Sequence, residues 1–171
     1  MADDQSKLAR WGKRIVIGRN PKRTLVRAAA LIVVSVIVFK FLLLPIRVTG
    51  ISMAPTYRDG GVIFVNRRAY LHTSPRRSDV VAIRLDGKAE LLLKRIVALP
   101  GERFSIDQGI VKINGQPLAE PYAGINRTWD LDEVLLSEED YWVMGDNRSM
   151  DQKSHTMQPV KLRDIIGKVV F

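Results

Sequence analysis

The 171-residue sequence contains no cysteine, which excludes a disulfide framework, a thiolate metal site and a cysteine nucleophile. Histidine is scarce, since His72 and His155 are the only two, and no cluster of side chains has the spacing of metal ligands. A glycine-rich phosphate loop is also missing, because Gly60-Gly61 is too short for one. We therefore expect no metal site and no cofactor. We expect His72 to be solvated; His155 could lie near a site, but we do not expect it to be catalytic.

Positive charge is concentrated near the N-terminus. The formal net charge is +9, and residues 1–27 hold eight Lys or Arg against two Asp, which leaves +6 in that arm. A basic arm can bind nucleic acid. Directly before an apolar run, however, it is more typical of a topology signal that stays on the cytoplasmic side and contacts anionic lipid. We therefore expect a phospholipid bilayer, and no nucleic acid, as a partner.

One long apolar run follows the basic arm. Residues 26–46 read VRAAALIVVSVIVFKFLLLPI, with Lys40 as the only charge after Arg27 and Pro45 near the end. About 20 apolar residues cross a bilayer as a helix. A cleaved secretory signal has the same order of regions, but this run is long and no small-x-small site follows it. We predict a basic cytoplasmic tail (1–25), an uncleaved transmembrane signal anchor (26–46) and an extracytoplasmic domain (47–171) at the plasma membrane.

Short apolar runs separated by turn residues dominate the rest of the chain. Turn signals include Asp59-Gly60-Gly61, Asp86-Gly87 and Pro100-Gly101. Residues 66–78 predict a basic surface loop, and residues 116–133 read as irregular. The expected strands cover 62–65, 79–83, 91–97, 104–106, 110–113, 141–144 and 165–171, the second and third forming a hairpin. The fold class is therefore mainly β, an antiparallel and partly closed β-domain after the transmembrane helix.

Two residues suggest nucleophilic chemistry. Ser52 follows the apolar run by a few residues in Gly50-Ile51-Ser52-Met53-Ala54-Pro55-Thr56, and Lys94 interrupts the apolar strand 91–97. A serine hydroxyl needs a base to remove its proton. A lysine can serve when burial lowers its pKa. Each residue alone has an ordinary explanation, a turn for Ser52 and a solvated strand edge for Lys94.

Four stretches, taken together, resemble the bacterial type I signal peptidases. These are membrane-anchored Ser/Lys endopeptidases that remove signal peptides from exported preproteins. The stretches are Gly50 to Thr56, Asp59 to Val65, Lys94 to Glu102, and Gly145-Asp146-Asn147-Arg148, and the closing 164–171 also fits. The resemblance covers about residues 25–171. It implies a signal-peptidase type of β-domain with a small, reduced cap insertion at about 104–140, and the Ser and Lys stretches together are specific.

The resemblance also implies roles for individual residues. Ser52 would be the nucleophile and an oxyanion donor through its backbone N–H, and Lys94 would be the general base. Asp146 and Arg95 would form a supporting ion pair beneath the site. The substrate would add as a strand, with small residues at the −1 and −3 positions in shallow pockets. The positions that match the pocket lining are Val48, Met53, Leu92 and Leu93. Signal peptides of exported preproteins would be the substrates of a monomer whose catalytic domain lies outside the membrane.

The sequence departs from the family pattern at three places. Gly50 stands where many members carry a Ser or Thr hydroxyl, with Thr49 as a conceivable replacement, and Gly60-Gly61 replaces Gly-Asp. The last motif usually ends Ser-x-Asp-Ser-Arg, whose first Ser steadies the lysine. An ungapped alignment places Asp151 at that Ser, Lys153 at the Asp, and Ser154 and His155 at the Ser-Arg; a two-residue deletion instead uses Ser149-Met150-Asp151. An Asp near Lys94 would raise the pKa of the amine and weaken the base.

Other functions remain compatible with the sequence. A processing protease for pilus or conjugation substrates would use the same dyad. So would a relative of the self-cleaving SOS repressors, although the anchor and the missing helix-turn-helix argue against it. The altered last motif motivates a third hypothesis, a catalytically impaired paralogue that binds exported peptides as a membrane-tethered module.

Overall fold

The computed structural model describes residues 20–85, 90–124, 128–155 and 158–170. The chain divides into two compact units, Met1–Phe41 and Leu42–Phe171. Most of the predicted basic tail and the predicted turn at Asp86-Gly87 lie outside the described residues.

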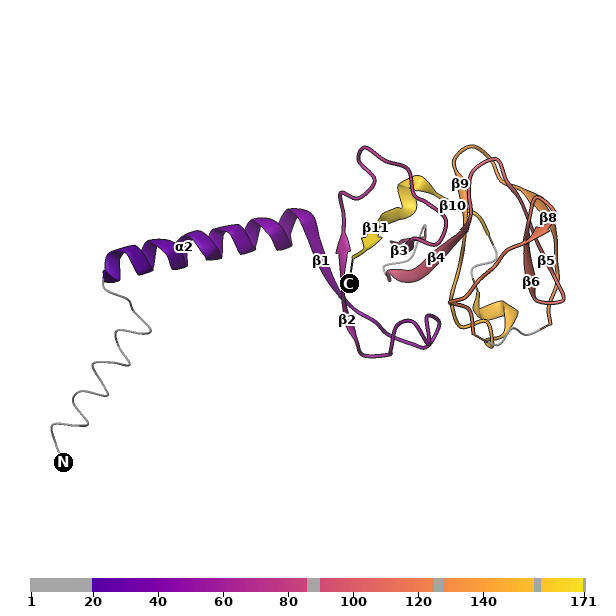
Figure 1. Cartoon of the computed structure of the whole chain (residues 1–171), viewed down its shortest axis with the longest axis horizontal. Helices are drawn as coiled ribbons and strands as arrows, with labels where there is room; N and C mark the ends of the chain where they lie inside the picture. The colour runs from indigo at the N-terminus through magenta and orange to yellow at the C-terminus, as the bar shows by residue number, and fades with distance from the viewer. Residues whose placement is uncertain (1–19, 86–89, 125–127, 156–157, 171) are drawn as a thin grey trace, which may run out of the picture. The chain divides into compact units, whose positions relative to one another are not determined.

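The first unit contains one helix, within the residues described. Helix α2, Pro21–Ile37, begins after Asn20 with proline at its first position and continues as a π-helix over Val38–Leu42 (Figure 1). The 22 residues Pro21–Leu42 have a mean hydropathy of 2.4 over their most apolar window and are long enough to cross a membrane. The sequence predicts helix to residue 46, but the structure ends it at Leu42. Proline at 45 cannot donate the helical hydrogen bond, so the chain becomes extended there.

The second unit is built on a seven-stranded antiparallel sheet. Its strand order is β1-β2-β11-β3-β4-β9-β10. The strands are β1 Leu43–Arg47, β2 Val62–Asn66, β3 Val80–Ile83, β4 Leu92–Ala98, β9 Asp140–Met144, β10 Val160–Lys161 and β11 Ile165–Val169. Strand β1 lies at the edge of this order, where Pro45 removes no bond that a further strand would need.

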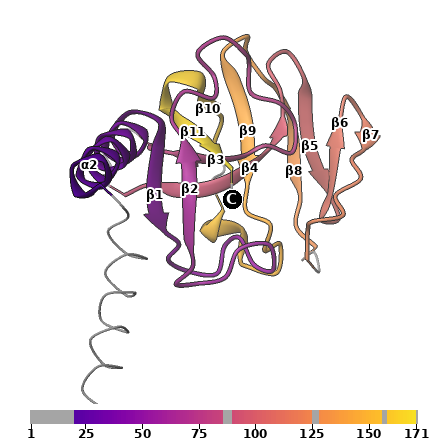
Figure 2. The ribbon, with the colours of Figure 1, turned by 60° about the vertical axis from the view of Figure 1, so that its left-hand side comes forward.

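A second, four-stranded sheet is formed by residues from the predicted insertion. It has the order β7-β6-β5-β8, with β5 Arg103–Asp107, β6 Ile110–Ile113, β7 Gln116–Pro117 and β8 Leu131–Leu135. Figure 2 shows it beside β9. Phe104 of β5 stacks on Trp142 of β9, with ring centroids 4.4 Å apart, and both side chains are buried. This contact belongs to an apolar cluster that also includes Val97 and Met144, so one core joins the two sheets.

The mainly antiparallel β fold is confirmed. The expected strands are present, most with ends within a residue or two of the prediction, and β3 pairs with β4 as a hairpin would require. Four strands were not predicted. They are β1, which continues the apolar run of the anchor, β8, which carries the charged pair Asp132-Glu133, and the two-residue strands β7 and β10. The described part of residues 116–133 is therefore less irregular than the sequence suggests, since it contains β7 and the start of β8.

Candidate active site

Ser52 lies on a loop that is closed at its base. The N–H of Val48 donates to the Gly61 carbonyl at 2.8 Å, and the N–H of Gly60 donates to the Val48 carbonyl at 2.9 Å. Met53, 1% exposed, inserts into the apolar cluster beneath the loop and anchors it. Gly50 has a φ of +88°, a conformation that L side chains rarely adopt. The loop geometry therefore accounts for glycine at the position where the family often carries a hydroxyl.

A second segment, the turn after β9, holds the Ser52 backbone. The Asn147 N–H donates to the Ser52 carbonyl at 3.0 Å, and the Asn147 side-chain amide donates to the Ile51 carbonyl, also at 3.0 Å. Gly145 lies so close that a methyl group in place of its hydrogen would be 2.4 Å from the Ser52 carbonyl oxygen. Only glycine fits there without moving the serine.

Lys94 converges on the same glycine from β4. It pairs with Val81 of β3 and is 4% exposed. The methyl group imagined on Gly145 would lie 3.6 Å from the Lys94 Nζ, so the amine and the Ser52 backbone adjoin the same small residue. Burial lowers the pKa of Lys94, and the negative charge of Asp146 opposes that shift. A lysine with a lowered pKa is the kind of base that a serine nucleophile requires.

Asp146 and Arg95 form a buried ion pair beneath this junction. The Asp146 side chain is fully buried and accepts from Arg95 Nε at 2.8 Å and from Arg95 Nη2 at 2.6 Å. The Thr56 hydroxyl also donates to Asp146, at 2.6 Å. The third Arg95 contact goes to the Ser78 carbonyl at 2.9 Å. The Ser52 loop, β4 and the turn after β9 are thus fixed to one another through a single carboxylate.

Residues 120–124, which we call the supporting segment, lie against the same turn. The Arg148 guanidinium donates two hydrogen bonds to the Glu120 carboxylate, one of them 2.7 Å long. The Glu120 and Arg148 side chains are 6% and 2% exposed. Arg148 Nε also donates to the Gly145 carbonyl at 3.0 Å. The Arg95 guanidinium lies 4.1 Å from the centre of the Tyr122 ring, a cation–π contact. The Gly124 N–H donates to the Asp146 carbonyl at 3.1 Å.

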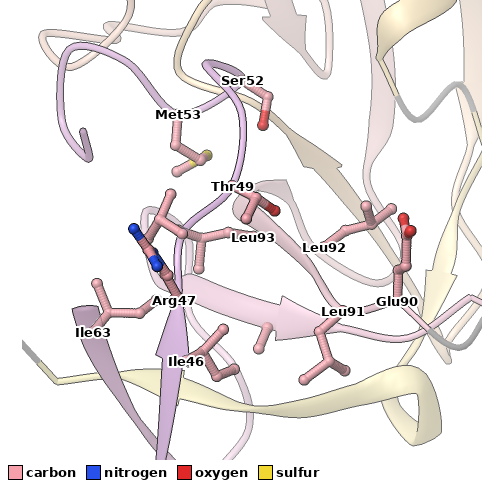
Figure 3. Close-up of a pocket in the computed structure, with 12 residues that line it drawn as sticks. Ile46, Arg47, Thr49, Ser52, Met53, Ile63, Glu90, Leu91, Leu92 and Leu93 are labelled. Carbon is pink, nitrogen blue, oxygen red and sulfur yellow. The ribbon is translucent and has the colours of Figure 1, made fainter. Parts of the chain in front are cut away.

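An apolar pocket of about 430 Å³ opens beside Ser52. All four predicted lining residues, Val48, Met53, Leu92 and Leu93, border it. The remaining residues are Ile46, Arg47, Thr49, Ser52, Ile63, Ala82, Glu90 and Leu91. Figure 3 shows Ser52 and Met53 at one end and Ile46 and Leu91 toward the other. The lining comes from both β1 and β4, although three strands separate them in the sheet order, so the sheet curves around the pocket.

The residues of the last motif lie in the turn after β9 and in the short helix that follows it. Ser149 is exposed and its hydroxyl donates to the Asn147 side-chain oxygen at 2.6 Å. Asp151 is also exposed and precedes the short 3₁₀ helix Gln152–Ser154. Asp146 is the carboxylate whose charge opposes the lowering of the Lys94 pKa by burial. The Ser149 hydroxyl is therefore bonded to Asn147, in the turn that holds the Ser52 backbone.

His155 lies close enough to Lys94 to sense its charge. It is 7% exposed, and its ring is 5.4 Å from that of Trp129. Burial first, and then the positive charges of Lys94 and Arg148, lower the pKa of His155 from 6.5 to about 4. The imidazole is therefore neutral at physiological pH, and its proximity to the site agrees with one of the possibilities left open by the sequence.

Sequence reasoning missed several of the supporting contacts. Asn147 and Arg148 stand in a recognised motif, so their importance could have been inferred from it. Glu120 and Tyr122 lie in a stretch with no periodic pattern, and nothing in the sequence indicates that Arg148 and Arg95 are their partners. Among the described residues, no group of three His, Asp or Glu side chains could hold a metal ion.

Known proteins resemble this chain over most of its length. The sequence model of the signal peptidase family, peptidase S26, matches residues 22–171. A signal peptidase I of Bacillus amyloliquefaciens is 33% identical over 156 residues, which cover 84% of this chain and 74% of that protein. Signal peptidase I T of Bacillus subtilis strain 168 is 32% identical over the same shares. A signal peptidase I structure from Enterococcus faecalis V583 shows 24% identity and a TM-score of 0.48, covering 57% of this chain and 98% of that one.

Proposed function

The chain belongs to the signal peptidase family S26 and is a serine peptidase, and we propose that Ser52 and Lys94 form the catalytic dyad with which it removes signal peptides. The observation that carries this proposal is the convergence of the Ser52 backbone and the Lys94 amine on Gly145, beside a pocket that Ser52 itself lines. No other serine–lysine pair with a lysine this deeply buried occurs among the described residues.

The chemistry follows from the lowered pKa of Lys94. The neutral amine accepts the Ser52 hydroxyl proton as the oxygen attacks the scissile carbonyl. The proton passes to the leaving amine as the peptide bond breaks, and an acyl-enzyme forms. Lys94 then takes a proton from the attacking water and returns it to the Ser52 oxygen as the acyl–oxygen bond breaks. The Ser52 N–H makes no hydrogen bond within the described residues, so it is free to donate to the oxyanion. Thr49, which borders the pocket, is a candidate second donor.

The pairing of β4 supports binding of the substrate as an added strand. Strand β9 pairs with β4 from Arg95 onward, so Leu92 to Lys94 have a strand neighbour only on the β3 side, as far as the structure describes the chain. An extended peptide can hydrogen-bond to that open edge. Its alternate side chains would enter the pocket between Leu92, Leu93 and the Val48 segment. Membership of the signal peptidase family implies small residues at the −1 and −3 positions of that strand.

The anchor and its orientation are part of the proposal. The apolar helix ends at Leu42, only ten residues before Ser52. The basic arm before it favours an N-terminus inside the cytoplasm and a monomeric catalytic domain outside. The enzyme would then act at the outer face of the plasma membrane, where signal peptides emerge.

Preprotein cleavage tests the proposal. The detergent-solubilised full chain should cut a preprotein at an Ala-x-Ala site, and Ser52→Ala and Lys94→Ala should each abolish the cut. Ser105→Ala and Lys112→Ala are matched controls on the second sheet and should retain wild-type rates. Cleavage that survives Ser52→Ala would refute the dyad.

One observation favours a second function. Among the described residues, no serine hydroxyl accepts a hydrogen bond from the Lys94 amine, as the family pattern would require. A lysine amine that no serine hydroxyl positions is what we would expect of a catalytically impaired paralogue that binds exported peptides in the same pocket. A well-folded wild-type chain that binds a signal peptide but does not cut it at any pH would favour this alternative. Nothing in the described part of the chain specifically favours a pilus or conjugation protease.

A further inference from the structure

A basic turn lies where the candidate membrane span ends. Leu42 is the last residue of that span, and the Arg67 N–H donates to its carbonyl at 3.0 Å. The next pair along the sheet is Leu43 with Asn66. Residues 67–72, Arg-Arg-Ala-Tyr-Leu-His, which we call the basic turn, are therefore tied to the end of the span by β-sheet geometry, independently of how the helix itself is oriented.

The basic turn has a fixed conformation. The Arg68 N–H donates to the Asn66 side chain at 2.9 Å, and the hydroxyl of Thr73, which follows the turn, donates to the Ala69 carbonyl at 2.9 Å. The Tyr70 hydroxyl donates to Asp79 at 2.9 Å, and the same carboxylate accepts from Lys168 at 2.6 Å. These contacts point Tyr70 inward and leave the neighbouring side chains on the outside.

The outer face of the turn combines positive charge with one large apolar side chain. Arg67 and Arg68 are exposed, and Leu71 is 62% exposed. Residues 66–78 contain no acidic residue, and within the described ranges neither guanidinium pairs with a carboxylate. Asp79 is buried and already paired with Lys168, so it does not neutralise the outer face.

We propose that the basic turn binds anionic phospholipid headgroups through Arg67 and Arg68, with Leu71 inserted among the acyl chains at the interface. The inference rests on the membrane anchor of the proposed function. Guanidinium groups at headgroup level are attracted to anionic lipid, and an exposed apolar side chain beside them gains by entering the interface. A nucleic acid would use the arginines but leave Leu71 in water. Lipid accounts for both features and for the position beside Leu42.

The surface also has a consequence for the peptidase. Strand β1 runs directly from Leu42 to the pocket, and β2 runs directly from the pocket to the basic turn. A lipid contact at the turn therefore fixes the ends of β1 and β2 that lie next to Leu42, and with them the distance between the pocket and the bilayer.

A single-cysteine experiment tests the proposal, because the chain has no cysteine of its own. Leu71→Cys in the full chain is labelled with a polarity-sensitive fluorophore and reconstituted into vesicles. The vesicles contain either phosphatidylcholine alone or a mixture with phosphatidylglycerol, and lipids with shallow acyl-chain spin labels serve as quenchers. Leu135→Cys on β8 is the matched control, since Leu135 is 67% exposed. Arg67→Ala with Arg68→Ala removes the charge, and the corresponding double Lys variant retains it.

We expect quenching and a blue shift at position 71, stronger in the anionic vesicles and absent at position 135. Each arginine favours the lipid-bound state by about fivefold, so the double Ala variant should lower the bound-to-free ratio about 25-fold. The double Lys variant should remain close to wild type. Quenching at 71 that is no greater than at 135, or equal in both lipid mixtures, would overturn the proposal. So would an emission change at 71 caused by added duplex DNA in place of anionic lipid.

Preprotein cleavage in the same vesicles separates the two hypotheses. Quenching at position 71 without cleavage supports the lipid surface and counts against the peptidase assignment. Cleavage with no quenching overturns the lipid surface and leaves the peptidase intact. Arg67 and Arg68 are outside the pocket, so their replacement should not reduce cleavage in detergent, where the protein contacts no bilayer.

Discussion

Replacing Glu120 by Gln should show that the supporting segment positions the turn after β9. The change keeps the shape of the side chain but removes its charge, which leaves Arg148 unpaired with 2% of its side chain exposed. Breaking a buried ion pair by removing one partner costs about 3–5 kcal/mol. Because Gln retains a hydrogen-bond acceptor, we expect a value near 3 kcal/mol. Thermal or urea unfolding of the full chain in detergent measures it.

The exposed pair of Arg103 and Glu133 is the matched control. It spans 2.9 Å, but 62% and 44% of the two side chains are exposed. Glu133→Gln should therefore cost at most about 1 kcal/mol. If Glu120→Gln were no more destabilising than Glu133→Gln, the supporting segment would not hold the turn as we describe.

The same replacement should lower the rate of cleavage. Arg148 fixes the Gly145 carbonyl, and Gly145 adjoins both Ser52 and Lys94. A small displacement of reacting groups can cost up to about 10²-fold in rate. We expect kcat to fall more than KM changes, because the pocket lining does not include Glu120. Replacing Glu120 and Arg148 together by Met should recover part of the stability, since no unpaired charge remains.

Three further changes probe the site. Gly145→Ala places a methyl group 2.4 Å from the Ser52 carbonyl oxygen and should reduce cleavage by about 10²-fold or more; Gly124→Ala, whose nearest contact would be 4.0 Å, should be nearly silent, and equal effects would contradict the packing argument. Lys94→Met removes a buried amine whose pKa is lowered, so the wild type gains stability as pH rises toward 10.5. In urea unfolding the variant should be more stable than wild type at pH 6, and the difference should shrink by pH 10. A difference in stability that does not change with pH would contradict this reasoning. Folding lowers the pKa of His155 from 6.5 to about 4, so the unfolded chain binds more protons than the folded chain between these pH values. The stability of the wild type should therefore decline by up to about 3 kcal/mol as pH drops through this range. His155→Gln should flatten this part of the stability-versus-pH curve, and parallel curves for the two proteins would exclude His155 as the cause.

Local pattern was enough to predict the central strands of the site. Lys94 stands between Leu91-Leu92-Leu93 and Ile96-Val97, and an apolar strand of that kind has to be covered. A lone lysine in such a strand is more often solvated at an edge, so its 4% exposure could be predicted only with the help of the family resemblance. The pocket lining could be predicted only through the resemblance to a family, because Val48 and Leu92 are distant in sequence and no periodicity relates them.

Nonlocal contacts were beyond the sequence. Glu120 pairs with Arg148 across 28 residues, and either side chain read alone resembles an ordinary surface charge. Strand β1 was hidden for a different reason. The apolar run continues from the helix through Leu43 and Leu44, so composition does not mark the point at which helix becomes strand; only Pro45 hints at it.

The pH dependence of kcat/KM tests the central claim most directly. The full chain would be assayed in detergent on an Ala-x-Ala preprotein from pH 6 to 11, with Lys94→Ala for comparison. We predict an acidic limb in which the logarithm of kcat/KM rises with a slope of about one and bends at an apparent pKa clearly below 10.5, because burial disfavours the Lys94 ammonium. A limb that bends at 10.5 or above, or cleavage that persists in Lys94→Ala, would contradict the assignment of Lys94 as the base.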